Sequence, residues 1–342
     1  MQREKRAHFF AVYPKGFFLI LFFCFMFVLQ PVYGAEQLVP VGKVVGITMD
    51  TEGLLVLGTG SVDGDKSHNV MPCKGVLQAG DRILEVNGKI MENKEMLMEV
   101  IEESAGAPLT FRLERLGKMR EVSITPEFST MDGTYKIGAW IRDSIQGIGT
   151  VTYYDPETGT VAALGHGVYD VDTDVLMEMR EGALVSTDLK EIAKGQNGEA
   201  GKLSGDLLLN DKIASMEKNT EKGIFGICDE DVFKAKALPI ANGSEVKKGE
   251  AVILSNLEGG DVKQYRVEIE AIQRNSRKSH KDMTIRIIDE RLLQLTGGIV
   301  QGMSGSPIIQ DGKLVGAVTH VLVNDPTRGY GIFIENMLDA AG

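Results

Sequence analysis

The sequence predicts a mainly β protein with two folded units behind an apolar N-terminal segment. Its 342 residues are too many for one small domain. The chain holds 40 glycines but a single tryptophan, a balance that favours turns and short strands over long helices. After the N-terminus, short β-rich runs alternate with Gly, Pro, Asn and Asp, and long helical patterns are scarce.

The first 35 residues have the order of an export signal. Basic residues precede the uncharged run 16–29, and small residues at positions 34 and 35 follow it. The order of basic region, apolar region and candidate cleavage site is typical of a signal peptide. We expect residues 1–35 to direct the chain across a membrane, and to act as a signal-anchor with a cytoplasmic N-terminus if they are not cleaved.

Charge and cysteine content limit the partners. A net charge of −11 argues against nucleic acid and against an anionic membrane surface. Beyond the N-terminal segment only Cys73 and Cys228 remain, without a CxxC or Cys/His cluster, so we expect no metal and no other cofactor. Whether these two cysteines form a disulfide stays open.

The first expected unit covers residues 38–128. Strands are expected at 44–49, 54–57 and 82–86, with a turn at 50–53. Asn87-Gly88 is a hairpin signal after the third strand. Asn93 is a candidate N-cap for a helix that ends near Ser104, and strands at 109–115 and 120–125 complete the unit.

The run GVLQAGDRILEVNG, residues 75–88, gives this unit a resemblance to PDZ domains, in the permuted form found in bacterial proteases. PDZ domains bind an extended peptide as an added strand at a sheet edge. The resemblance implies peptide capture by a loop near Val45, Gly46 and Ile47. The alternative is that Gly46 only relieves packing in a small barrel.

The second expected unit covers residues 133–342. Few long helices are predicted there, apart from one at 334–341, so an all-β barrel or pair of barrels is expected. The expected strands are residues 149–154, 161–164, 250–254, 264–272, 284–288, 307–309 and 314–320.

A Gly-x-Ser-Gly-x-Pro turn makes Ser304 a candidate nucleophile. Gly302 and Gly305 permit a tight turn that exposes the hydroxyl group, and Pro307 begins an apolar hairpin. The same turn can direct the N–H groups of Gly302 and Ser304 at a developing oxyanion.

A serine hydroxyl needs a base, and His166 is the leading candidate. It lies between two glycines at the end of an apolar strand, where a substrate backbone can approach. His280 lies in a charged stretch that is expected to be a solvated loop, and His68 belongs to the insert of the PDZ-like unit. His320 is expected either to line a substrate pocket or to form a hydrogen bond in the core.

The carboxylate that would orient His166 is less well determined by the sequence. Asp289 precedes Ser304 by fifteen residues and follows an expected strand, but it can equally end that strand or cap a helix. Asp170, Asp172 and Asp174 lie close to His166 in the chain, and they stay open as alternatives.

As a whole, the chain resembles the stage IV sporulation peptidases of endospore-forming bacteria. The resemblance is carried by the apolar N-terminus, GVLQAGDRILEVNG, GTVAALGHGVYD and the block from residue 285 to residue 333. It implies a chymotrypsin-like β-barrel peptidase with a triad of His166, Asp289 and Ser304. By analogy, a substrate pocket is expected near Thr319, His320 and Val321.

The resemblance also implies a signalling role. Family members are made in the forespore and cross its inner membrane into the intermembrane space, where they stay anchored until they cleave themselves. They then cleave the regulatory subunit of an intramembrane metalloprotease that processes a sigma-factor precursor, and the PDZ domain binds the peptidase's own chain or the target. The alternatives are a broad-specificity envelope quality-control protease with a PDZ domain and a non-catalytic PDZ scaffold.

Overall fold

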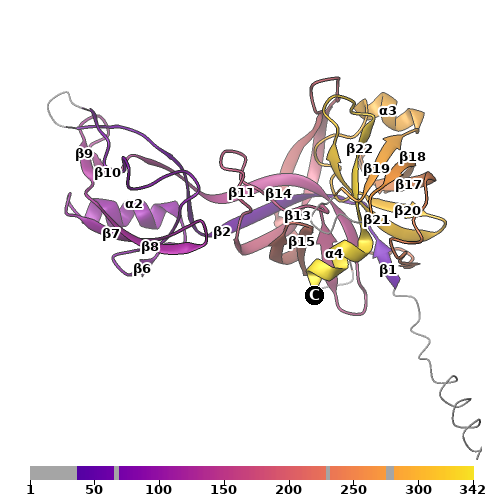
Figure 1. Ribbon diagram of the computed structural model, residues 1–342, viewed down its shortest axis with the longest axis horizontal. Helices are drawn as coiled ribbons and strands as arrows, with labels where there is room; N and C mark the ends of the chain where they lie inside the picture. Colours follow the sequence, from indigo (N-terminus) through magenta and orange to yellow (C-terminus); the bar gives the residue numbers. More distant parts are fainter. Residues whose placement is uncertain (1–36, 65–68, 229–231, 275–280) are drawn as a thin grey trace, which may run out of the picture. The chain divides into compact units, whose positions relative to one another are not determined.

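The computed structural model describes residues 37–64, 69–228, 232–274 and 281–342. It is mostly strands, as predicted (Figure 1). The first strands are β1 (Gln37–Pro40), β2 (Val44–Thr59), β3 (Val62–Asp63), β4 (Asn69–Val70), β5 (Arg82–Val86), β6 (Lys89–Ile90), β7 (Leu109–Arg115), β8 (Lys118–Ile124), β9 (Glu127–Ser129), β10 (Thr134–Lys136) and β11 (Ala139–Tyr154). The others are β12 (Thr160–Ala163), β13 (Met179–Ala193), β14 (Lys202–Thr220), β15 (Gly223–Ile227), β16 (Leu238–Pro239), β17 (Gly249–Ser255), β18 (Lys263–Ile272), β19 (Met283–Ile287), β20 (Pro307–Gln310), β21 (Lys313–Val321) and β22 (Arg328–Phe333). The described helices are α2 (Lys94–Glu103), α3 (Glu290–Thr296) and α4 (Ile334–Ala341).

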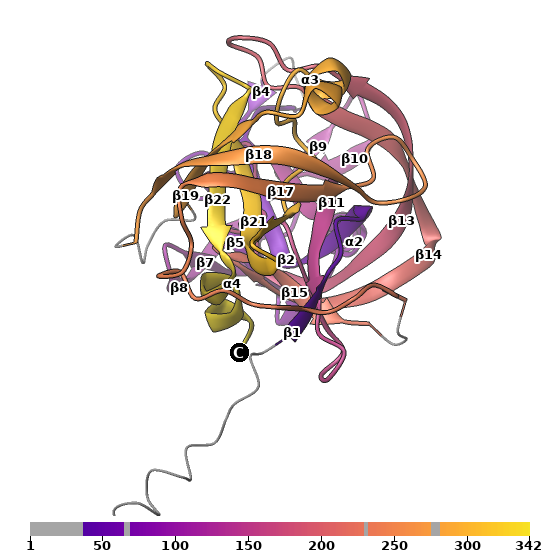
Figure 2. The same ribbon diagram turned by 90° about the vertical axis from the view of Figure 1, so that its right-hand side faces the viewer.

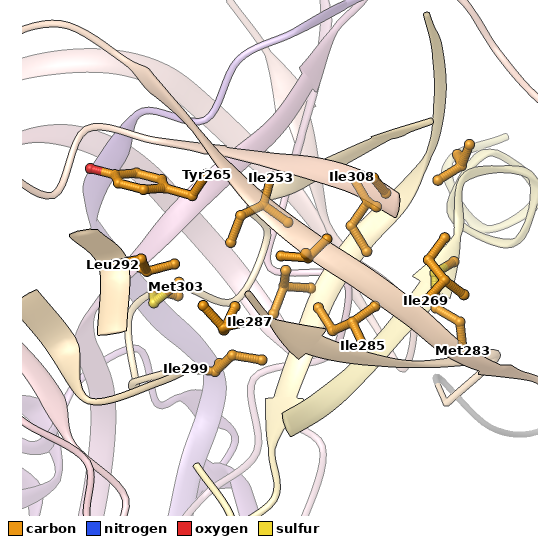
Figure 3. Packing of buried hydrophobic residues seen from close by; sticks show 14 of the residues in the cluster. Ile253, Tyr265, Ile269, Met283, Ile285, Ile287, Leu292, Ile299, Met303 and Ile308 are labelled. Carbon is orange, nitrogen blue, oxygen red and sulfur yellow. The ribbon is translucent and has the colours of Figure 1, made fainter. Parts of the chain in front are cut away.

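One barrel is built from a continuous stretch of the C-terminal half. Its strands pair in the closed order β17-β18-β19-β22-β21-β20. In Figure 2, β17 and β18 cross β21 and β22. The barrel is filled by alternating apolar side chains such as Ile253, Tyr265 and Ile285, all fully buried (Figure 3). Burying every second residue of each strand is what stabilises the barrel.

A second closed ring of strands precedes it in the chain. β2 pairs with β11, and the ring continues through β12, β15, β14 and β13 back to β2. The paired β13 and β14 are long, and neither strand was expected from the sequence. Buried residues from β2, β11, β12 and β14, among them Val45 and Ile47, fill this barrel. We call it the first barrel and the ring of β17–β22 the second barrel.

The PDZ-like unit is inserted into the first barrel. Its hydrophobic core runs from Leu54 to Ile137 and includes α2. β2 and β11 each belong to both parts: Asp50 pairs with Ser144 in the barrel, and Leu55 pairs with Arg142 in the PDZ-like sheet.

The expected boundaries of 38–128 and 133–342 therefore need correction. Residues 44–50 of β2 pair within the first barrel and β1 pairs with β11, so the PDZ-like unit occupies about 51–143. The chain does not reverse at the turn expected at 50–53, because β2 continues to Thr59. The strand is irregular there: Gly53 has a φ of 72°, and the pairing with β11 shifts register between Asp50 and Leu55. The β strands at 82–86 and 109–115, the Asn93 cap and the helix at 334–341 lie where they were expected.

The two barrels share a hydrophobic cluster. Leu38, Tyr153 and Phe225 of the first barrel pack with Leu314 and Ile332 of the second barrel, and α4 covers the cluster. The expected export segment, residues 1–35, lies outside the described residues, as do His68 and His280. Within the described residues, no helix has the length and apolarity needed to cross a membrane.

Candidate active site

Ser304 lies on a tight turn between α3 and β20 of the second barrel. Met303 before it is fully buried in the barrel core beside Leu292 (Figure 3), so the next side chain is directed away from the core. Gly302 has a φ of 101° and Gly305 a φ of 96°, which L side chains rarely adopt. The Ser304 hydroxyl donates a hydrogen bond of 2.6 Å to the carbonyl oxygen of Thr319.

Gly305 is required by a close approach of the first barrel. A Cβ atom at this position would lie 1.9 Å from the Thr150 carbonyl oxygen and 2.6 Å from the Leu164 backbone nitrogen. Without a side chain there, β11 and the end of β12 reach the Ser304 turn. The sequence pattern correctly indicated a tight turn at Ser304. The backbone that packs against Gly305, however, belongs to the first barrel.

His166 reaches the same place from the first barrel. It follows β12 after Leu164 and Gly165, whose φ values are 71° and 68°. A Cβ atom on Gly165 would contact Thr319 at 3.1 Å, so the backbone of this loop lies against the end of β21. The ring centroids of His166 and His320 lie 4.7 Å apart, and the angle between the two ring planes is 38°.

The tautomer of His166 follows from its hydrogen bond. Nδ1 lies 2.7 Å from the carbonyl oxygen of Gly167. A carbonyl oxygen only accepts, so in the neutral ring Nδ1 carries the hydrogen and Nε2 is the basic nitrogen. The ring therefore has the tautomer that a general base acting through Nε2 requires.

The expected pocket residues border both groups. Thr319, His320 and Val321 end β21; Thr319 is buried, and the other two are half-buried. Thr319 accepts from Ser304, and His320 packs against His166. The end of β21 thus connects the candidate nucleophile with the candidate base.

The N–H groups of Gly302 and Ser304 are available to a ligand. Neither donates a hydrogen bond to another group within the described part of the chain. The Gln301 carbonyl accepts from Leu203 at 2.9 Å, and the Met303 carbonyl accepts from Ser306 at 3.0 Å. Because N–H and C=O point in opposite directions across a trans peptide, both N–H groups face away from these partners.

Asp289 does not contact His166 in this structure. It caps α3 by accepting from the backbone N–H groups of Arg291 and Leu292 at 3.1 and 3.4 Å, and it accepts from the Arg266 N–H at 3.2 Å. The Arg291 guanidinium lies 2.9 Å from its carboxylate. This ion pair is the main cause that lowers the pKa of Asp289 to about 2. The expected role of orienting His166 is therefore corrected: α3 begins directly after β19, and its free N–H groups take up the carboxylate.

The other acidic candidates organise the loop after His166. Asp170 is buried and accepts from the backbone and hydroxyl of Thr173, each at 2.9 Å. It also pairs with Arg142 of β11, which contacts Asp172 at 2.9 Å. Burial raises the pKa of Asp170, but hydrogen bonds from Thr173, Arg142 and the backbone N–H of Asp172 hold it below its usual value.

The peptide-binding position expected at Val45, Gly46 and Ile47 is also wrong. These residues lie in the first barrel, paired with β11 on one side and β13 on the other, so no sheet edge is open there. Val45 and Ile47 are buried, and a Cβ atom on Gly46 would lie 2.5 Å from Leu207. Gly46 relieves packing, which was the alternative interpretation.

The PDZ-like unit has its groove elsewhere. A cavity of about 700 Å³ lies between α2 and the segment 134–141. Leu97, Met98 and Ile101 line it from α2, and Ile137 and Trp140 line it from the opposite side. Trp140 and Met98 are more than 60% exposed. In the described residues, 139–142 of β11 pair with β2 alone, which leaves the other edge of β11 for an added strand.

The sequence profile of the SpoIVB peptidase S55 family matches residues 133–338. The chain belongs to this family. The expected resemblance to this family is confirmed.

Curated relatives match only short stretches. The zinc metalloprotease RasP of Geobacillus kaustophilus is 40% identical over 57 residues, 17% of this chain and 14% of that protein. A putative zinc metalloprotease of Bartonella henselae is 34% identical over 73 residues, 21% of this chain and 20% of that protein. The chain thus spans at most a fifth of either relative.

Solved structures resemble the parts of the chain. The PDZ domain of an SdrC-like protein from Listeria monocytogenes covers 26% of this chain and 87% of its own, with 24% identity and a TM-score of 0.22. The active form of the Rv3671c protease from M. tuberculosis covers 57% of this chain and 72% of its own, with 14% identity and a TM-score of 0.33. The HtrA-type protease AlgW with a decapeptide covers 89% of this chain and 64% of its own, with 11% identity and a TM-score of 0.37.

Proposed function

We propose that this peptidase cleaves protein chains by acyl transfer, with Ser304 as nucleophile and His166 as base. The observation that supports this is the convergence of two loops, one from each barrel, at the end of β21. Ser304 attacks the peptide carbonyl while Nε2 of His166 takes its proton, and the Gly302 and Ser304 N–H groups stabilise the oxyanion. His166 then protonates the leaving amine.

Substrate binding has to redirect the Ser304 hydroxyl. Its proton is directed at the Thr319 carbonyl rather than at His166. A substrate strand that pairs with the end of β21 would donate its own N–H to that carbonyl and release the hydroxyl toward His166. Asp289 acts in this mechanism through α3, which leads into the Ser304 turn.

The second part of the proposed function is a signalling role in sporulation. The family name indicates a sporulation peptidase. In this proposal the chain cleaves itself and then cleaves a regulatory subunit of an intramembrane metalloprotease, which would trigger sigma-factor processing. In this proposal residues 1–35 anchor the chain in the forespore inner membrane, with its body in the intermembrane space until self-cleavage releases it. The groove between α2 and β11 binds a peptide of the peptidase's own chain or of its target.

The chemistry is tested by following the intact mass of the purified full chain over time, beside Ser304→Ala. Truncation of the wild type alone supports the proposal and gives the cleavage sites. Self-cleavage by Ser304→Ala would refute it. If neither is truncated and a fluorophosphonate probe does not label Ser304, the chain is a scaffold. Degradation of unfolded casein at many sites would instead indicate a quality-control protease.

The groove is tested through the single tryptophan of the chain. Because Trp140 is exposed and lines the groove, a bound peptide should shift its fluorescence. Peptides that tile the segment around the self-cleavage site are suitable probes. Met98→Asp should weaken binding at least tenfold without changing turnover of a short fluorogenic peptide, and equal binding by Met98→Asp would place the peptide elsewhere.

A further inference from the structure

Two buried threonines of β11 hold the turn that carries Ser304. Thr150 and Thr152 are 0% exposed, and their side chains leave the same face of the strand. The Thr150 hydroxyl donates to the Gly302 carbonyl and the Thr152 hydroxyl donates to the Gly305 carbonyl, each at 2.8 Å. The Thr150 N–H donates to the Ser304 carbonyl at 2.9 Å.

These contacts matter because the turn has little conformational preference of its own. Gly302 and Gly305 flank Ser304, and glycine populates many backbone conformations almost equally. An oxyanion hole works only when its N–H groups are held in place before the reaction. The geometry of this turn must therefore be imposed by its neighbours, and the two threonine hydroxyls bracket Met303 and Ser304.

The contacts are also formed between the two barrels. The threonines belong to the first barrel, while the carbonyl oxygens belong to the second barrel. Strand β11 thus fixes the nucleophile turn with its side chains, and the loop after β12 supplies His166. A displacement of one barrel relative to the other would change the distance between Ser304 and His166 and the orientation of the oxyanion N–H groups together.

We infer that Thr150 and Thr152 are positioning residues for the nucleophile and the oxyanion hole. This inference rests on the proposed function, since it assumes that Ser304 is the nucleophile. The hydroxyl group, rather than the volume of the side chain, carries the effect. Valine has nearly the shape of threonine but no hydroxyl, whereas serine keeps the hydroxyl and loses the methyl group.

The test compares Thr150→Val and Thr152→Val with Thr150→Ser and Thr152→Ser. Turnover of a fluorogenic peptide that spans a self-cleavage site is measured with the thermal midpoint of each variant. We expect each valine variant to lower kcat at least tenfold with KM within about twofold of wild type, because displacements of about 1 Å cost up to 100-fold in rate. The serine variants should recover most of kcat.

A matched control separates positioning from stability. Thr51 is also buried, and its hydroxyl donates to the carbonyls of Gly53 and Asp143, away from the Ser304 turn. Thr51→Val should lower the thermal midpoint but leave kcat per folded molecule unchanged. Folded fractions are determined from the thermal transition followed by circular dichroism.

The possible outcomes are distinguishable. Valine variants with wild-type kcat per folded molecule would overturn the inference, as would serine variants that lose as much kcat as the valine variants. If Thr150→Val does not fold, the Thr152 pair gives the same comparison. If the wild type shows no turnover that depends on Ser304, the proposed function fails instead.

Discussion

The two barrels each supply part of the candidate site, but they are laid out differently along the chain. The second barrel is formed by residues 249–333 in one stretch. The first barrel begins with β2, is interrupted by the PDZ-like unit, and resumes in β11. Asp50 pairs directly with Ser144 across the interruption. The insertion therefore replaces a hairpin turn, a position where a fold tolerates an added domain because the ends already lie together.

Removing strands should affect the interrupted barrel most. The fragment 133–342 has lost β1 and β2, so β11 and β13 lose their shared partner and the barrel opens. We expect no cooperative thermal transition and no Ser304 labelling from this fragment. By contrast, replacing residues 51–143 with Asn-Gly should give a two-residue hairpin between Asp50 and Ser144 and a folded, self-cleaving peptidase.

Circular dichroism on heating and probe labelling measure both variants. A fragment 133–342 that melts cooperatively and labels at Ser304 would contradict the assignment of residues 44–50 to the first barrel. Failure of the Asn-Gly variant alone would show that the PDZ-like unit stabilises the barrel, through contacts such as the Arg142–Asp170 ion pair.

The sequence predicted the contiguous barrel better than the interrupted one, and the reason is physical. A strand pattern reports which residues alternate between buried and exposed, but it does not report the pairing partner. Residues 44–49 were correctly expected to form a strand, yet they pair with β11 and β13 rather than within the PDZ-like unit. The turn residues at 50–53 suggested a chain reversal, whereas in the structure they form an irregularity within β2, where the pairing with β11 shifts register.

Contact between the barrels should depend on Gly305. In Gly305→Ala the new Cβ atom would lie 1.9 Å from the Thr150 carbonyl oxygen. With the added strain at a φ of 96°, we expect a loss of about 3 kcal/mol or more in the free energy of unfolding. Gly312→Ala is the control, since its φ is 76° but nothing lies within 4 Å, so about 1 kcal/mol is expected.

Urea unfolding with equal m-values gives both numbers. The contrast between the two glycines isolates the close approach of the barrels from backbone strain. Equal losses for the two variants would mean that the turn can move away from β11, and the first barrel would then not hold the Ser304 turn.

The candidate site shows a similar limit of sequence reasoning. Ser304 and His166 were indicated by glycines that flank them, a local signal. Thr150 and Thr152 carried no local signal, because threonine is common in any strand. Asp289 stood at a suitable distance before Ser304, but the start of a helix offers a carboxylate its own N–H partners. Whether such a carboxylate caps the helix or orients the catalytic base depends on where α3 lies in the fold.

Substitution of Asp289 is expected to change stability less than the variants above. It decides whether this carboxylate caps α3 or orients His166. Asp289→Asn keeps a good helix cap but loses the charge paired with Arg291, so we expect a loss of about 1 kcal/mol in stability at pH 7. Asp289→Ala should lose about 2 kcal/mol, since the cap is lost as well. The kcat of the folded enzyme should change little, because the carboxylate contacts neither His166 nor Ser304.

The pH dependence of stability sharpens this test. The pKa of Asp289 is lowered from 3.8 to about 2, so folding favours the ionised carboxylate. The resulting stabilisation is fully present above the unfolded pKa and is lost as the pH falls through the folded pKa. The difference between wild type and Asp289→Asn should therefore shrink between pH 4 and pH 2. A fall in kcat of about 10⁴-fold with unchanged stability, as expected for loss of a carboxylate that orients the base, would instead make Asp289 the partner of His166.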